Sequence, residues 1–114
     1  MTPITTHVLD TSTGKPACGL AVTLEYETQE AGWQTMANGV TDNDGRINNL
    51  ITSDTVLSAG RYRLTFETGD YFHMRQTECF FPQVTIAFVV KDVGQHFHVP
   101  LLLSPFSYST YRGT

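Results

Sequence analysis

Histidines are the side chains in this 114-residue chain best suited to proton transfer near neutral pH. His96 and His98 flank Phe97, and alternate residues of a strand point to one face, about 6–7 Å apart. With His7 as a third ligand, such a pair could bind zinc, although no Cys, Asp or Glu has a companion spacing. Plain surface histidines on an edge strand are the remaining interpretation.

The last four residues are the second chemically unusual feature of the chain. Tyr111, Arg112, Gly113 and Thr114 bring a phenol, a guanidinium, a hydroxyl and a carboxylate together behind an apolar run. Final residues are usually loose and chemically dull. We therefore expect this tail to lie in a site, with Gly113 allowing a final turn without a Cβ clash.

Two further motifs are weaker indications of function. Residues 42–45 resemble a fragment of a calcium loop, but Arg46 stands where an oxygen ligand belongs and no Glu follows at the required position. A hairpin-type turn is the better interpretation. The serines near the C-terminus lack the G-x-S-x-G elbow, which argues against a serine hydrolase.

Composition narrows the class of protein. Seven Lys and Arg against eleven Asp and Glu give a mildly acidic chain without a basic stripe, so nucleic acid is not an expected partner. No apolar stretch reaches the ~18 residues of a membrane span. The first residues do not resemble a secretory signal, nor the last a peroxisomal one, so we expect a cytoplasmic protein. Two cysteines fit a reducing compartment but leave a Cys18–Cys79 disulfide open.

Apolar residues alternate with polar ones along most of the chain, which predicts half-buried strands separated by Gly, Pro and Asp turns. This pattern predicts a single all-β domain over residues 1–114, a sandwich of seven or eight strands. A short helix is expected near residues 69–75, with Asp70 as its cap. The clearest alternating runs are 20–26, 62–67, 84–90 and 97–103.

The run 97–103 also indicates assembly. Its outer face carries His98, Pro100 and Leu102, although a small sandwich normally leaves that face wet. We expect another subunit to cover it. Because Pro100 lacks an N–H, it should lie where one strand neighbour is missing or bulged.

Four segments together resemble the 5-hydroxyisourate hydrolases of the transthyretin-related protein family: residues 7–17, 44–46, 96–105 and 111–114. The resemblance covers the chain from about Ile4 to Thr114. The terminal Tyr-Arg-Gly-Thr is its most specific part, because it separates these enzymes from the hormone carrier transthyretin. Two residues depart from the family pattern, because Thr114 stands where Ser is usual and Phe97 where Tyr is usual. The strand parity of Phe97 predicts that its side chain points into the core.

The resemblance implies a transthyretin-like β-sandwich of two four-stranded sheets with one short helix. It also implies a homotetramer whose active sites lie at the dimer–dimer interface and use residues of more than one subunit. The implied activity opens the six-membered cyclic amide ring of 5-hydroxyisourate to 2-oxo-4-hydroxy-4-carboxy-5-ureidoimidazoline, in the degradation of urate to allantoin.

The resemblance also assigns the site. His7, Arg46 and His98 would be catalytic, and substrate would be bound by His7, Arg46, Tyr111, Arg112, Gly113 and Thr114. His96 is second tier, and no metal or organic cofactor is required. Which imidazole takes the first proton stays open. A carrier of apolar hormones and a zinc hydrolase are the alternatives, and the charged, titratable groups favour a small polar heterocycle over a long aromatic hormone.

Overall fold

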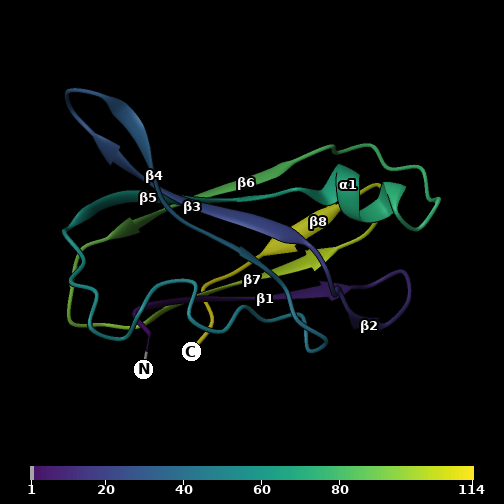
Figure 1. Cartoon of the computed structure of the whole chain (residues 1–114), viewed down its shortest axis with the longest axis horizontal. Helices are drawn as coiled ribbons and strands as arrows, with labels where there is room; N and C mark the ends of the chain where they lie inside the picture. The colour runs from purple at the N-terminus through teal and green to yellow at the C-terminus, as the bar shows by residue number, and fades with distance from the viewer. Residues whose placement is uncertain (1) are drawn as a thin grey trace.

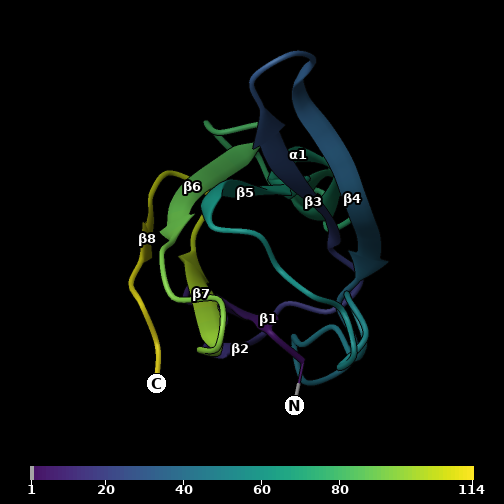
Figure 2. The ribbon, with the colours of Figure 1, turned by 90° about the vertical axis from the view of Figure 1, so that its left-hand side faces the viewer.

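Two four-stranded sheets pack face to face in this computed structural model, which describes residues 2–114 (Figures 1 and 2). Met1, the first residue of the domain expected over 1–114, lies outside the described residues. One sheet has the order β2-β1-β7-β8 and the other β4-β3-β5-β6, which confirms the predicted sandwich. The elements are β1 (Ile4–Asp10), β2 (Lys15–Pro16), β3 (Ala21–Thr28), β4 (Gly32–Val40), β5 (Gly60–Phe66), α1 (Thr68–His73), β6 (Val84–Val90), β7 (Phe97–Leu103) and β8 (Tyr108–Thr110).

Parallel pairing of β1 with β7 forms the centre of the first sheet. Ile4 lies opposite Phe97 and Asp10 opposite Leu103, whereas every other strand pair in residues 2–114 is antiparallel. In this register Thr5 lies opposite His98. The pairing therefore brings the outward side chains of the first strand beside the histidines, which lie about ninety residues later in the chain.

The core fills the space between the sheets and follows the predicted alternation. Phe97 is buried at 5% exposure, which confirms its inward parity. Tyr26 departs from the pattern, because it is 39% exposed at the far end of β3. There the β3–β4 hairpin shifts register between Leu24 and Glu25 and extends past the other sheet (Figure 1). The fully buried side chains come from both sheets and the helix, among them Ile4, Val8, Leu20, Leu24, Leu64, Phe66, Phe72, Leu101 and Leu103.

Helix α1 lies close to its predicted range, but its cap differs from the prediction. Asp70 stands within the first turn, and the N-cap is Glu67, which makes no side-chain capping bond. A loop carbonyl satisfies one N–H of the helix start instead, because the Gly69 N–H donates to Pro82 O at 2.9 Å. The Thr68 hydroxyl anchors the same end by donating to Phe81 O at 2.6 Å. Tertiary partners thus replace the local cap.

Pro100 lies where the ladder between β7 and β8 has ended, as expected for a residue without an N–H. That ladder covers Leu101 to Leu103, and beyond it the Thr110 hydroxyl donates to Pro100 O at 2.7 Å.

Both cysteines are free, so the open possibility of a Cys18–Cys79 disulfide is not realised. The Cys18 thiol donates to Asn43 Oδ1 at 3.2 Å. No helix within residues 2–114 has the length and apolarity needed to cross a membrane.

The predicted turn at residues 42–45 places Arg46 against β1. Asp42 accepts N–H bonds from Asp44, Gly45 and Arg46, and the Val8 N–H donates to Gly45 O at 2.8 Å. Gly45 has a φ of +75°, and a Cβ there would collide with the carbonyl oxygen of Val8. Close approach of the turn to β1 therefore requires glycine at this position.

We expect Gly45→Ala to destabilise the protein more than Gly14→Ala, with unfolding in urea as the measurement. Gly14 also has a positive φ (+72°), but a Cβ at that position would have no neighbouring atom within 4 Å. The left-handed backbone alone should cost about 1–2 kcal/mol at either position. The collision with Val8 should add about 1–3 kcal/mol at Gly45 only. Equal losses in the two variants would contradict the close-approach explanation.

Candidate active site

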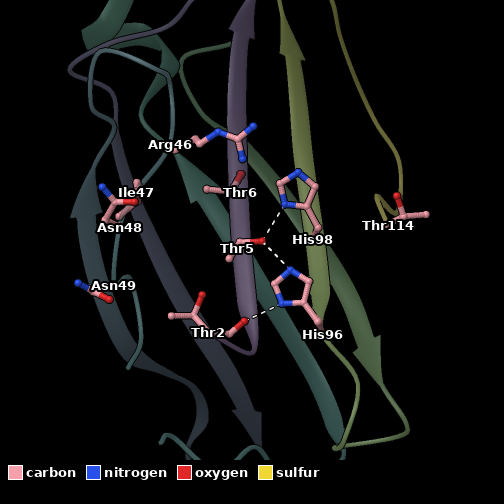
Figure 3. Close-up of a pocket in the computed structure, with 10 residues that line it drawn as sticks. All are labelled: Thr2, Thr5, Thr6, Arg46, Ile47, Asn48, Asn49, His96, His98 and Thr114. Carbon is pink, nitrogen blue, oxygen red and sulfur yellow. Dashed lines mark hydrogen bonds between the residues drawn. The ribbon is translucent and has the colours of Figure 1, made fainter. Parts of the chain in front are cut away.

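A polar pocket of about 500 Å³ opens on the outer side of the β1–β7 pair (Figure 3). Its walls come from the start of the chain and β1, from the segment after β4, from β7 with the residues before it, and from the tail. The lining residues are Thr2, Thr5, Thr6, Arg46, Ile47, Asn48, Asn49, His96, His98 and Thr114.

His96 and His98 face this pocket together, as their alternation predicts. Their rings are nearly parallel at 12°, with centroids 6.4 Å apart. Thr5 Oγ1 lies between them, 3.1 Å from His96 Nε2 and 2.7 Å from His98 Nδ1 (Figure 3). The remaining ring nitrogen of His96, Nδ1, lies 2.6 Å from the carbonyl oxygen of Thr2.

The environment of His98 favours its neutral form. Burial, followed by the nearby charges of Arg46, His96 and His7, lowers the pKa of His98 below its ordinary value. The second ring nitrogen, Nε2, points away from Thr5 toward the side where Arg46 lies (Figure 3). A neutral imidazole and a fixed cation therefore share one cavity, a combination suited to water activation and anion stabilisation.

Gly113 joins the tail to His98. Its N–H donates to His98 O at 2.8 Å, and a Cβ at this position would lie 2.5 Å from His98 Cδ2. Gly113 is not among the glycines with positive φ. The residue is small because it packs against the imidazole, so the expected role in a final turn is not the physical reason for glycine here.

His7 and Arg46 meet at the edge of the pocket through an isolated antiparallel bridge. Only Arg46 lines the pocket itself. His7 Nε2 lies 2.8 Å from Asp44 O in the turn that precedes Arg46. The contact ties the His7 imidazole to the turn that carries the guanidinium.

Tyr111 and Arg112 lie elsewhere in the single chain. They line a second hollow of about 240 Å³ with apolar side chains of β6 and β7, such as Phe88 and Val99. The Arg112 guanidinium lies 4.9 Å from the ring centroid of Phe97 and donates to Gln95 Oε1 at 2.8 Å. Tyr111 remains 58% exposed. Their expected binding role stays a prediction, and Thr114 is the tail residue that lines the first pocket.

The three histidines do not assemble as the zinc alternative requires. Within residues 2–114, no three His, Cys, Asp or Glu side chains gather closely enough to hold a metal ion. His7 contacts the Asp44 carbonyl, and the Thr5 hydroxyl occupies the space between the other two imidazoles.

The model of the HIUase/Transthyretin family matches residues 4–113. The chain belongs to this family. The 5-hydroxyisourate hydrolase of Mus musculus is 44% identical over 113 residues, which cover 98% of this chain and 95% of the mouse protein. Among solved structures, Klebsiella pneumoniae 5-hydroxyisourate hydrolase is 45% identical with a TM-score of 0.83, covering 97% of this chain and 98% of that one. Sea bream transthyretin in complex with thyroxine is 35% identical with a TM-score of 0.91, covering 98% and 95%.

Sequence reasoning missed several lining residues of this HIUase/Transthyretin family member, chiefly Thr2, Thr5, Asn48 and Asn49. For Thr5 a signal existed, because it has the same strand parity as His7 on β1. The contact of Thr5 with both later imidazoles depends on the parallel register, which alternation alone does not specify.

We expect Arg46→Gln to raise the pKa of His98, because the guanidinium is one of the charges that disfavour the imidazolium. The pKa should still stay below its ordinary value, since burial is the larger cause. Titration of the His98 ring by NMR measures this directly. Arg61→Gln, which removes an exposed guanidinium paired with Glu27, is the control and should leave the titration unchanged. An unchanged or lower pKa in Arg46→Gln would show that the guanidinium does not act on His98.

Proposed function

We propose that this protein is a 5-hydroxyisourate hydrolase, which opens the six-membered cyclic amide ring of its substrate to give 2-oxo-4-hydroxy-4-carboxy-5-ureidoimidazoline. The observation that supports this most is the joint location of a neutral His98 and Arg46 in one polar pocket. Two relatives bearing the hydrolase name, those of Salmonella dublin and mouse, are 43% and 44% identical over nearly the whole chain.

In this proposal His98 is the general base. Water attacks the carbonyl carbon of the cyclic amide and gives a proton to His98 Nε2, while Arg46 stabilises the negative charge on the carbonyl oxygen. The C–N bond of the tetrahedral intermediate then breaks, and the leaving nitrogen takes the proton that His98 Nε2 received from water, which restores the neutral base. His7 lies beside Arg46, where it relays this proton and helps to bind the substrate. No metal or organic cofactor takes part in any of these steps.

The complete site is proposed to form in a homotetramer, at the interface between two dimers. The outer face of the β2-β1-β7-β8 sheet would then be covered, and the exposed Tyr111 would close the pocket floor with Arg112 nearby. Leu102, an apolar side chain that stays partly exposed on that face, supports this arrangement, whereas Pro100 is already buried within the single chain. Light scattering should give about four times the mass of one chain, and a fully active monomer would contradict the shared site.

A carrier of apolar hormones is the second candidate, because the backbone is so similar to a thyroxine-bound transthyretin, with a TM-score of 0.91. The pocket is better suited to a small polar heterocycle. Its imidazoles, guanidinium and hydroxyls need hydrogen-bonding partners, which a long apolar ligand would leave unsatisfied.

Freshly made 5-hydroxyisourate should lose its ultraviolet absorbance faster with the protein than in buffer alone. We expect His98→Asn and Arg46→Glu each to lower turnover by at least ~10²-fold, the usual contribution of a general base or a charge-stabilising group. Circular dichroism and light scattering check that fold and assembly are intact. Activity should survive chelator treatment. A wild-type protein that gives no acceleration over buffer would remove the hydrolase proposal.

The tail should be needed for activity rather than for folding. Gly113→Ala places a methyl group 2.5 Å from His98 Cδ2, so the imidazole or the tail must move. Because displacements near 1 Å can cost about 10²-fold in rate, we expect a loss of that order. Deletion of residues 111–114 should cost at least as much while the sandwich stays folded. Gly94→Ala is the control, since its nearest contact is an ordinary 3.4 Å. Retained turnover in both tail variants would exclude the tail from the site.

A further inference from the structure

We propose that Thr5 and His96 are positioning residues that hold the proton of the neutral His98 imidazole on Nδ1 and so leave Nε2 free to accept a proton in the pocket. A chain of hydrogen bonds runs from the Thr2 carbonyl through His96 and Thr5 to His98 (Figure 3). The catalytic role of this chain rests on the proposed hydrolase function, whereas its effect on the His98 tautomer does not.

The Thr2 carbonyl fixes the proton of His96. Its Nδ1 lies 2.6 Å from the backbone oxygen of Thr2, and a carbonyl oxygen can only accept. His96 Nδ1 therefore carries a hydrogen and donates it. In a neutral imidazole one nitrogen donates and the other accepts, so His96 Nε2 is an acceptor.

His96 in turn fixes the direction of the Thr5 hydroxyl hydrogen. A hydroxyl has one hydrogen to donate and lone pairs to accept with. Thr5 Oγ1 lies 3.1 Å from His96 Nε2, which needs a donor, so the hydroxyl hydrogen is directed there. The oxygen can then only accept from its other partner. His98 Nδ1, 2.7 Å away, must be that donor.

Thr5 thereby fixes the tautomer of His98, the proposed base. With its hydrogen on Nδ1, neutral His98 has its lone pair on Nε2, the nitrogen that points toward the side of Arg46 in Figure 3. An imidazole base generally needs a second group that fixes its tautomer. Here the group is an uncharged hydroxyl, oriented in turn by another imidazole.

Backbone pairing holds this arrangement in place. Thr5 and His98 are directly opposed in the parallel β1–β7 register, and the peptide N–H of Gly113 holds His98 from the tail side. Loss of Thr5 or His96 should favour the opposite tautomer of neutral His98, with the hydrogen on Nε2. Without His96, the Thr5 hydroxyl is free to donate to His98 Nδ1, which moves the ring proton to Nε2 and removes the base.

Long-range ¹H–¹⁵N NMR of the histidine rings tests the structural part at mildly alkaline pH. In the wild-type protein, His98 should show a protonated Nδ1 and an unprotonated Nε2. His96→Phe and Thr5→Val should each shift the distribution toward the Nε2–H form by about five- to tenfold, the factor that one ordinary hydrogen bond contributes to an equilibrium. Thr5→Ser keeps the hydroxyl and should preserve the wild-type distribution. A wild-type His98 with its proton on Nε2 would overturn the proposal.

Turnover tests the catalytic part on the same samples. Thr5→Val should lower kcat by about tenfold with little change in KM, and Thr5→Ser should restore most of the loss. Thr65→Val is the matched control, because Thr65 lies on β5 in the other sheet, where its hydroxyl contacts that of Thr85. An altered tautomer with unchanged kcat in Thr5→Val would overturn the positioning role. If wild-type protein fails to hydrolyse 5-hydroxyisourate, the proposed function fails, while the NMR result still decides the tautomer.

Discussion

The parallel pairing of β1 with β7 is the constraint on which the site depends. It places Thr5 opposite His98 and His7 opposite Pro100, and it joins the start of the chain to its last long strand. The turn that carries Arg46 also packs against β1, because the Val8 N–H donates to Gly45 O. The tail then adds to the far side of β7 through Gly113. Four distant segments thus converge because one central strand pair offers hydrogen-bonding edges on both sides.

Two side chains in the pocket divide two roles that one side chain could not combine, a proton acceptor and a permanent positive charge. Arg46 stays cationic at any working pH, and its field acts against a proton on His98. The imidazole is therefore kept as a base, while the positive charge needed near a developing oxyanion comes from the guanidinium. Burial strengthens both effects, since fewer waters screen the interaction in a half-enclosed cavity. The hydroxyl of Thr5 contacts both imidazoles without adding a charge that would compete with Arg46.

The sequence predicted the parts of this structure that follow from local periodicity. Alternation located β5, β6 and β7, the inward Phe97 and the shared face of His96 and His98, because a strand fixes side-chain direction residue by residue. Features decided by distant partners were missed. The carbonyl of Pro82 replaced the expected Asp70 cap, and the contacts of Thr5 and Gly113 with the histidines depend on inter-strand register. The candidate site was therefore predictable as a list of histidines and a tail, but not as a connected hydrogen-bond network.

Backbone similarity alone cannot decide between a hydrolase and a carrier. Sea bream transthyretin has the higher TM-score, 0.91 against 0.83, whereas the Klebsiella hydrolase has the higher identity, 45% against 35%. Inward side chains preserve the sandwich, and the outward positions of β1 and β7 are free to differ without cost to the core. In this chain those positions hold Thr5, His7 and His98, and Gly113 of the tail packs against the His98 imidazole. A Cβ at residue 113 would displace His98, so the residue at position 113 and the proposed base cannot vary independently. This coupling depends on the side chains of the site rather than on the fold.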